Sequence, residues 1–304
     1  FYGMKAGGRD YFYNEKKSDR PGDERNLLLN DRQVKFEKYL TDAFSEKAVE
    51  FINESSQPFM MYLAYNAVHT PMQATDEDMA KFEGHPRQKL AAMTYALDRG
   101  VGTVIRGLKD SGKFDNTLIF FLSDNGGATT NQSSNYPLKG FKGNKFEGGH
   151  RVPYFVVWKN GIPAGKPYDG LVSSLDIFAT AIDAASISKT RNRLDGVSLL
   201  PYLKGKKGEP HKVLYWRKMD TRAIRSGDYK LIITHGVDSV LYNIRRDPEE
   251  MNNLINKEPD LYRKLAKKLA KWEKNECIEP SWLEEGWRKI TNRYHQQLMH
   301  NEIK

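Results

Sequence analysis

Three short segments of this 304-residue chain carry polar residues whose types suit the binding of a tetrahedral anion. The segment "YNAVHTP" offers His69, "SDNGG" offers Asp124 and Asn125, and the glycine-rich "PLKGFKGNKFEGGHRVP" offers Lys142 and His150. Carboxylate and amide oxygens are hard donors that suit Ca²⁺ or Mg²⁺. A metal ion and a lysine would take the non-bridging oxygens of the anion, and a histidine would hydrogen-bond or protonate another oxygen.

Every one of these residues also has a purely structural explanation. The "SDNGG" run fits an ordinary turn after a strand, and the histidine of "YNAVHTP" could cap a turn. The glycine-rich segment holds further charged residues, namely Lys139, Lys145, Glu147 and Arg151. A lysine in such a loop is usually solvated, and Glu147 could pair with a lysine or an arginine. The prediction of a site therefore depends on the three segments in combination.

The polar segments adjoin predicted strands. Short apolar runs predict strands over 59–65 and 118–123, and a third strand in "VPYFVVW". In open α/β sheets, ligands bind beyond the carboxyl ends of the strands. If the three segments lie at one sheet edge, their side chains converge.

Amphipathic helices alternate with these strands. Apolar residues at helical spacing predict helices at about 40–54 and 87–109, and a further helix in "SLDIFATAIDAAS". Strands that alternate with helices are typical of an α/β fold whose sheet is mainly parallel. We therefore predict an α/β fold with a mainly parallel sheet sandwiched by helices.

The pattern changes near residue 205, in "LKGKKGEPH". Short strands separated by Gly and Asp follow, which is typical of an antiparallel sheet, and a Lys-rich helix over about 259–275 closes this part. We predict a catalytic α/β domain over 1–205 and a smaller α+β subdomain over 206–304.

The composition fits a soluble globular protein. The chain is 39% hydrophobic and 29% charged, and no stretch has the length of a membrane span. The net charge of +9 leaves an anionic partner plausible. No nucleic-acid-binding signature accompanies the scattered Lys and Arg residues, so we expect no nucleic acid. With Cys277 as its one cysteine, the chain offers no internal disulfide and no cysteine-based metal site; we expect an incidental thiol.

Spaced motifs from "FYGMKAGGRDYF" to about residue 275 resemble the type I, formylglycine-dependent sulfatase family of the alkaline phosphatase superfamily. They include "SDNGG", "PLKGFKGNKFEGGHRVP", "LDGVSLLPYLKG", "RAIRSGDYKLI" and "LYNIRRDPEEMNNL". The resemblance implies an alkaline phosphatase-like fold and the hydrolysis of sulfate esters. It also implies export to the periplasm, the extracellular space or the lysosome.

The resemblance implies a role for each candidate residue. Asp124 and Asn125 would be two ligands of a divalent metal, Ca²⁺ rather than Mg²⁺. Lys142 would contact the sulfate, and His69 would contact it near the leaving-group oxygen. His150 stands where the family has an aliphatic residue, and it either reaches the substrate or lines the cavity wall.

The chain departs from the family in one important respect. It has no C/S-x-P/A-x-R segment, whose Cys or Ser is oxidised to the formylglycine nucleophile. It therefore resembles the C-terminal two-thirds of a sulfatase. We expect the formylglycine and the remaining metal ligands upstream of this sequence, and we expect this chain alone to be inactive.

Two other functions stay open. One is hydrolysis of phosphonates or phosphodiesters, which the same superfamily performs. The other is a non-catalytic basic domain that binds sulfated glycans. The basic residues and the aromatic stretch "HKVLYWRKMDTR" favour a sulfated carbohydrate as substrate, although ordinary strand packing explains that stretch equally well.

Overall fold

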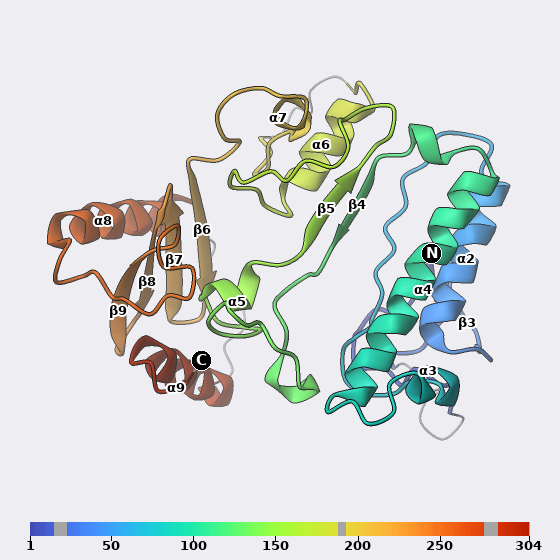
Figure 1. Cartoon of the computed structure of the whole chain (residues 1–304), viewed down its shortest axis with the longest axis horizontal. Helices are drawn as coiled ribbons and strands as arrows, with labels where there is room; N and C mark the ends of the chain where they lie inside the picture. Colours follow the sequence, from blue (N-terminus) through green and yellow to red (C-terminus); the bar gives the residue numbers. More distant parts are fainter. Residues whose placement is uncertain (15–22, 188–192, 277–284, 304) are drawn as a thin grey trace. The chain divides into compact units, whose positions relative to one another are not determined.

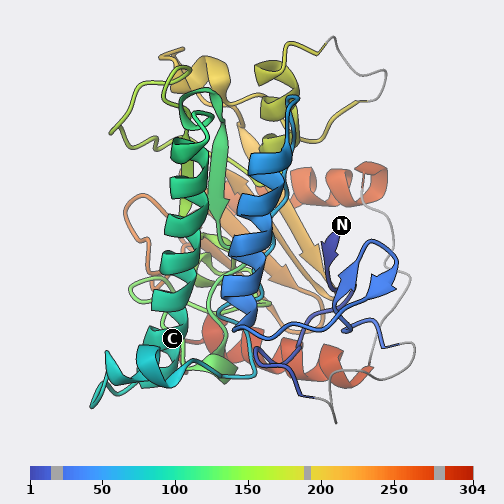
Figure 2. The same cartoon turned by 90° about the vertical axis from the view of Figure 1, so that its right-hand side faces the viewer.

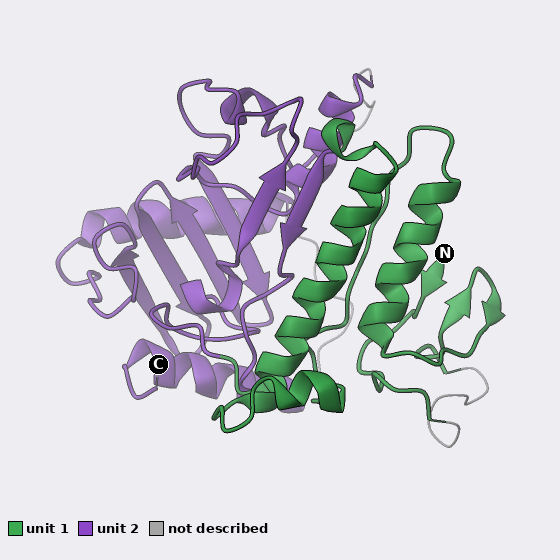
Figure 3. Ribbon diagram, turned by 45° about the vertical axis from the view of Figure 1, so that its right-hand side comes forward, with its two compact units in different colours: residues 1–117, 130–133 green, residues 118–129, 134–304 purple. Residues whose placement is uncertain are grey.

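The computed structural model forms two compact units (Figure 3). The described residues are 1–14, 23–187, 193–276 and 285–303. The first unit comprises residues 1–117 and 130–133, and the second comprises residues 118–129 and 134–304. Domains over 1–205 and 206–304 stay a prediction. Cys277 lies outside the described residues.

Two long helices dominate the first unit, α2 (Leu40–Glu54) and α4 (Gln88–Asp110), and they pack side by side (Figures 1 and 2). They confirm the two helices predicted there. A Cβ on Gly107 would lie only 2.9 Å from the Val49 side chain, so this glycine permits the close approach. The unit also contains α3 (Asp76–Ala80), η1 (Phe114–Asn116) and three short antiparallel strands, β1 (Tyr2–Gly3), β2 (Leu28–Leu29) and β3 (Arg32–Gln33).

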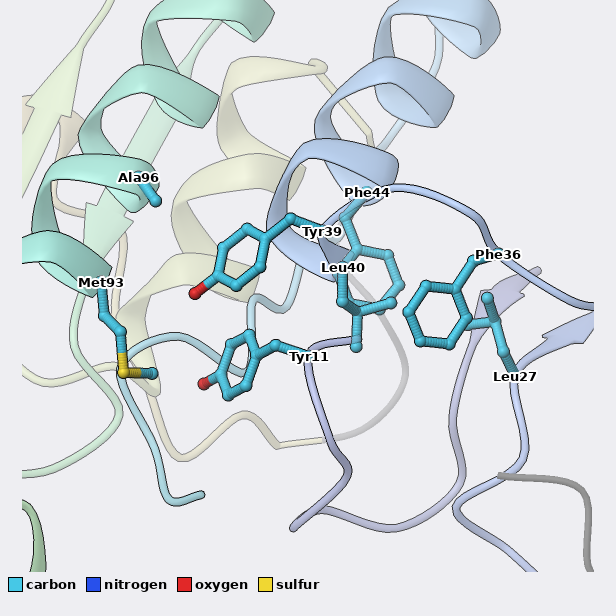
Figure 4. Packing of buried hydrophobic residues seen from close by; sticks show 8 residues of the cluster. All are labelled: Tyr11, Leu27, Phe36, Tyr39, Leu40, Phe44, Met93 and Ala96. Carbon is cyan, nitrogen blue, oxygen red and sulfur yellow. The ribbon is translucent and has the colours of Figure 1, made fainter. Parts of the chain in front are cut away.

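The core of the first unit joins the N-terminal segment to the two helices (Figure 4). Its buried members are Tyr11, Leu27, Phe36, Tyr39, Leu40, Phe44, Met93 and Ala96. The rings of Tyr11 and Tyr39 stack with their centroids 5.3 Å apart. Aromatic pairs of this kind add to the stabilisation that burial provides.

The strand predicted over 59–65 is wrong in one respect. Its side chains alternate in exposure as a strand's do, with Met60 and Tyr62 exposed and Leu63 packed on the core. No strand pairs with this segment among the described residues, and a strand requires a neighbour to take up its backbone N–H and C=O groups. The pattern predicts an extended segment correctly, but it does not supply the neighbour.

In the second unit, β4 (Ile119–Leu122) and β5 (Tyr154–Val157) confirm the strands predicted in these segments. They pair antiparallel, with Phe120 opposite Val156. Every strand pairing in the described ranges is antiparallel, so these residues do not show the mainly parallel sheet predicted from the alternation. An apolar run indicates a strand but carries no information about its direction. Helices α6 (Asp176–Ala184) and α7 (Leu200–Leu203) follow. The short η2 (Thr129–Asn131), which precedes the glycine-rich loop, belongs mostly to the first unit.

A four-stranded antiparallel sheet forms the rest of the second unit (Figure 1). Its strands, in order, are β6 (Val213–Lys218), β7 (Thr221–Ser226), β8 (Tyr229–Thr234) and β9 (Asp238–Asn243). The helix α8 (Pro259–Glu276) packs on one face through Leu265 and Leu269. The antiparallel sheet and its closing helix confirm the prediction for this part of the chain.

The other face of this sheet packs against α9 (Glu285–Met299), which the sequence reading did not predict. Its buried positions are Thr291, His295, Leu298 and Met299. Two of these four side chains are polar, so the helical spacing is present but the apolar stripe is short. Within the described ranges, no helix is both long and apolar enough to cross a membrane.

Candidate active site in the second unit

The end of β4 is fastened to the glycine-rich loop by backbone hydrogen bonds. The N–H of Gly126 donates to the carbonyl of Gly149 at 3.1 Å, and the N–H of Lys142 donates to the carbonyl of Gly127 at 3.0 Å. These two bonds bring the "SDNGG" and "GFKGN" segments together. The second unit therefore holds the predicted oxygen donors and the predicted lysine in one place.

The glycines in both segments are required by this close approach of backbones. A Cβ on Gly126 would lie 1.8 Å from the carbonyl oxygen of Gly148. A Cβ on Gly149 would lie 2.4 Å from the carbonyl oxygen of Asn144. No side chain larger than hydrogen fits at either position without moving backbone. The glycines after Asp124 thus do more than form a turn.

The side chains of Asp124 and Asn125 are available to bind a ligand. Asp124 is exposed and Asn125 is half-buried, and neither side chain forms an ion pair or hydrogen bond in the part of the chain that the structure describes. Their oxygens therefore fit the donor set of a hard divalent cation. No group of three His, Cys, Asp or Glu residues gathers to hold a metal among the described residues. The pair would supply part of a coordination shell.

Two lysines of the loop have opposite roles. The ammonium group of Lys139 is fully buried, donates to the carbonyl of Glu250 at 2.8 Å and also bonds Asn301. It lies over the ring of Phe146, 5.3 Å from the centroid. The Lys142 ammonium group is exposed and has no partner among the described residues. Lys139 is therefore structural, whereas Lys142 is free to bind an anion.

Glu147, in the short helix α5 (Glu147–His150), is the centre of a buried ion-pair cluster. Its carboxylate lies 2.9 Å from the Lys230 ammonium, 3.4 Å from the Arg225 guanidinium and 3.6 Å from that of Arg151. Burial alone would raise the pKa of Glu147, but the charge and hydrogen bond of Lys230 lower it to about 2. Glu147 is therefore ionised and paired with basic side chains, as its structural explanation predicts.

Glu250 completes this cluster from the segment after β9. Its carboxylate accepts the backbone N–H of Glu147 at 2.6 Å and lies 3.0 Å from the Lys230 ammonium. Burial raises the pKa of Glu250 to about 7 despite the Lys230 charge. The cluster joins three separate motifs, because Glu147, Lys230 and Glu250 come from "FEGGHRVP", "RAIRSGDYKLI" and "LYNIRRDPEEMNNL".

His150 packs against the sheet. Its ring stacks on Trp216 of β6 with the centroids 4.5 Å apart and the planes 11° apart. Burial, together with the charge of Lys230, lowers the pKa of His150 to about 3. The ring is therefore neutral near pH 7, and it can offer shape or a hydrogen bond but no charge.

His69 belongs to the first unit, where its loop is held by the core. The Tyr11 hydroxyl donates to the carbonyls of Asn66 at 2.6 Å and His69 at 2.9 Å. The Nδ1 of His69 lies 2.8 Å from the carbonyl oxygen of Thr70. Because a carbonyl only accepts, Nδ1 is the donor in this bond, which leaves Nε2 as the atom that can exchange a proton.

The comparisons with known proteins agree with these features. A family model described as Sulfatase matches residues 1–187. This chain belongs to the sulfatase family. A second model, described as N-sulphoglucosamine sulphohydrolase, C-terminal, matches residues 142–275, so the two overlap over 142–187, from the glycine-rich loop onward.

Relatives of this sulfatase chain include both characterised and uncharacterised proteins. An uncharacterized sulfatase of Escherichia coli, YdeN, is 37% identical over 71% of the chain and 38% of its own length. N-acetylgalactosamine-6-sulfatase of Canis lupus familiaris is 32% identical over 64% of the chain and 38% of its own length. The chain thus spans 38% of the length of these two curated relatives.

Solved structures share the fold. Ps i-CgsB, solved in complex with k-i-k-neocarrahexaose, is 34% identical, with a TM-score of 0.85 over 99% of this chain and 72% of its own. The phosphonate monoester hydrolase of Agrobacterium radiobacter is 24% identical, with a TM-score of 0.51 over 66% of this chain and 44% of its own. The second likeness shows the fold alone. These neighbours are consistent with the expected alkaline phosphatase-like architecture.

Several functional residues of the sulfatase chain were missed from the sequence. The pairing of Glu147 with Lys230 and Arg225 spans about 80 positions. Both partners lie in the motif "RAIRSGDYKLI", but the motif does not show which residue they contact. In "HKVLYWRKMDTR", Tyr215 stacks on Trp272 of α8 at 4.9 Å and is a packing residue. Trp216 faces the other side of the sheet, and so does Lys218, because alternate residues of a strand share a face. The alternation of side chains along β6 is the sequence signal that could have separated the packing residue Tyr215 from Trp216 and Lys218.

Proposed function

We propose that the complete protein is a sulfatase that hydrolyses sulfate esters of a carbohydrate. The observation that carries this proposal is the pair of backbone bonds that holds the loop of Lys142 against the segment of Asp124 and Asn125. The side chains of all three residues have no partner among the described residues. A cationic side chain and a cation-binding pair at one place suit the charged oxygens of a sulfate ester. The family membership of the chain supports this reading over a general anion site.

The residues of this chain take the following roles in the proposal. Asp124 and Asn125 hold a divalent cation, Ca²⁺ rather than Mg²⁺ as the family resemblance implies, and that cation supplies charge stabilisation to the sulfate oxygens when bound. Lys142 binds a non-bridging oxygen of the sulfate. His69 delivers a proton through Nε2 to the oxygen of the departing alcohol, since Nδ1 is engaged by Thr70. The neutral ring of His150 lines the wall.

The nucleophile in this proposal is a formylglycine contributed by residues outside this sequence. The role of this chain is then to bind the sulfate and the cation and to protonate the leaving group. Without such a nucleophile the chain alone would not turn over. Export of the complete protein remains a prediction.

Two similar proteins support a carbohydrate as the substrate in this proposal. One relative is named N-acetylgalactosamine-6-sulfatase, and one solved neighbour was crystallised with k-i-k-neocarrahexaose. Both are at least 30% identical to this chain. The basic character of the chain, with a net charge of +9, suits a polyanionic glycan.

A comparison of ester types tests the proposal against its alternatives. The full-length protein would be assayed on 4-nitrophenyl sulfate, 4-nitrophenyl phenylphosphonate and bis(4-nitrophenyl) phosphate, and for sulfate release from sulfated oligosaccharides. We expect the highest kcat/KM on the sulfate esters. A higher kcat/KM on the phosphonate or the phosphodiester would favour the sibling hydrolase. Binding of sulfated oligosaccharides with no turnover of any ester would favour a binding domain.

A further inference from the structure

Two more lysines lie beside Lys142. Lys218 ends strand β6, and its Nζ lies 2.9 Å from the position that a Cβ on Gly143 would occupy. Burial and then the positive charge of Lys142 lower the pKa of Lys218. Lys145 is half-buried in the same loop, and burial followed by the charges of Lys218 and Lys230 lowers its pKa to about 8. The Lys218 ammonium therefore lies beside the backbone next to Lys142, and its charge acts on both Lys142 and Lys145.

No carboxylate of the described residues pairs with these three lysines. Among the described residues, none of their ammonium groups forms an ion pair or a hydrogen bond. The nearby carboxylates, Glu147 and Glu250, are both engaged by Lys230. Like charges held close together in a partly buried place are unfavourable unless an anion binds there.

Two histidines near these lysines are uncharged. The neutral ring of His150 covers Trp216, which shares a face of β6 with Lys218. His295 of α9 is fully buried, and burial lowers its pKa to about 4, so it is neutral as well. Gly143 has a φ of +97° and lies between Lys142 and Asn144, so the backbone itself leaves room for the Lys218 ammonium. In the described part of the chain, neither these histidines nor an ion pair offsets the charge of the three lysines.

One sulfate does not require three lysines. Lys142 and the cation at Asp124 and Asn125 already provide for the ester sulfate in the proposed function. We propose that Lys145 and Lys218 form a second anion subsite, which binds another sulfate or carboxylate group of the same substrate. The inference rests on the proposed function and specifies its substrate class as a sugar with at least two anionic groups.

Sulfonates provide probes that sulfatase chemistry does not cleave. The full-length protein would be titrated by calorimetry with ethane-1,2-disulfonate and propane-1,3-disulfonate, which carry two anionic groups, and with methanesulfonate, which carries one. We expect at least one disulfonate to bind about tenfold more tightly than methanesulfonate, because charge-assisted hydrogen bonds to the second group add affinity.

Variants of Lys145 and Lys218 test whether these two lysines cause the preference for disulfonates. Lys145→Met and Lys218→Met remove the charge and keep the apolar stem, and we expect each to reduce the disulfonate preference at least about threefold while methanesulfonate affinity is kept. Lys268→Met, on the exposed side of α8, is the matched control and should change neither affinity. Equal affinities for the wild-type protein, a preference that survives in both variants, or equal losses for both probes would overturn the second subsite.

Turnover of 4-nitrophenyl sulfate separates this inference from the proposed function. If the protein hydrolyses 4-nitrophenyl sulfate but shows no preference for disulfonates, the second subsite is excluded and the sulfatase function stands. If the disulfonate preference depends on the two lysines but no sulfate ester is hydrolysed, the second subsite stands and the proposed reaction is excluded.

Discussion

At the scale of single residues, burial decides which charged side chains can do chemistry. Lys139 and Lys142 are three positions apart in one glycine-rich loop. Lys139 is fully buried and bonded to residues more than 100 positions away, whereas Lys142 is exposed and unpaired in the described part of the chain. The sequence predicts a loop with free lysines, but only the folded chain distinguishes the structural lysine from the one that can bind an anion.

Lys139→Met should lower stability without changing sulfate binding. The variant leaves the Glu250 carbonyl and Asn301 without their buried donor, and we expect a loss of about 1–3 kcal/mol in the free energy of unfolding. Urea unfolding of the full-length protein measures the loss, and the KM for 4-nitrophenyl sulfate should stay within about twofold of wild type. A raised KM with unchanged stability would show that the roles of the two loop lysines are reversed.

Asp124→Ala should weaken the binding of Ca²⁺. The variant removes one of two hard oxygen donors that have no partner among the described residues. Metal analysis after dialysis against graded Ca²⁺ concentrations measures the change. Asp169→Ala, at another exposed aspartate, is the matched control and should behave as wild type. Unchanged Ca²⁺ content in the Asp124 variant would exclude this residue as a ligand.

At the scale of elements, the buried cluster around Glu147 fastens α5 and its loop to strands β7 and β8. The contacts reach Arg225 on β7 and Lys230 on β8, and Glu250 holds the backbone N–H of Glu147. Removing one partner from such a cluster leaves charge buried and unpaired, which costs several kcal/mol. The loop that carries Lys142 is therefore positioned by residues that do not themselves bind substrate.

Glu147→Gln should destabilise the protein most at neutral pH. The folded-state pKa of Glu147 is about 2, below its ordinary value of 4.5, so folding favours the ionised form. That stabilisation is complete above about pH 4.5 and is lost as the pH falls through about 2. We expect a loss of about 3 kcal/mol at pH 6, which narrows as the pH is lowered below 4.5.

Urea unfolding of the full-length protein from pH 6 to pH 3 measures this dependence. Glu258→Gln, at an exposed glutamate ahead of α8, is the matched control and should leave stability within about 0.5 kcal/mol at every pH. A Glu147 variant whose loss does not change with pH would contradict the ion-pair role. The pKa of the neighbouring Glu250 is raised to about 7. Both variants are therefore compared from pH 6 downward, so that titration of Glu250 adds little to the measured change in stability.

The elements themselves were predictable to different degrees. Helices α2, α4 and α8 follow from strong apolar periodicity, and each lies close to its predicted range. The period-2 pattern over 59–65 identifies an extended segment, but the pairing that makes a strand depends on a neighbour. The described residues show β4 and β5 paired antiparallel and do not show the mainly parallel sheet, because apolar runs carry no information about strand direction. α9 was missed because Thr291 and His295 occupy half of its buried positions.

At the scale of the whole molecule, the family is shown and the reaction is proposed. The predicted site residues fall into both units, with His69 in the first and Asp124, Asn125, Lys142 and His150 in the second. The motifs of the sequence identify these residue types, because their order and spacing are specific. The sequence could not show that "SDNGG" and "GFKGN" are joined through backbone bonds, since those contacts depend on the fold.

The most direct test of the sulfatase function is the rate at which full-length Lys142→Ala releases inorganic sulfate from a sulfated oligosaccharide, measured beside wild type and Lys268→Ala. If Lys142 holds the sulfate, its loss should reduce kcat/KM by about 10²–10³ while the thermal midpoint is unchanged. The Lys268 variant should keep wild-type turnover. Wild-type sulfate release by Lys142→Ala would contradict the proposed site, and no release by the wild-type protein from any sulfate ester would contradict the proposed function.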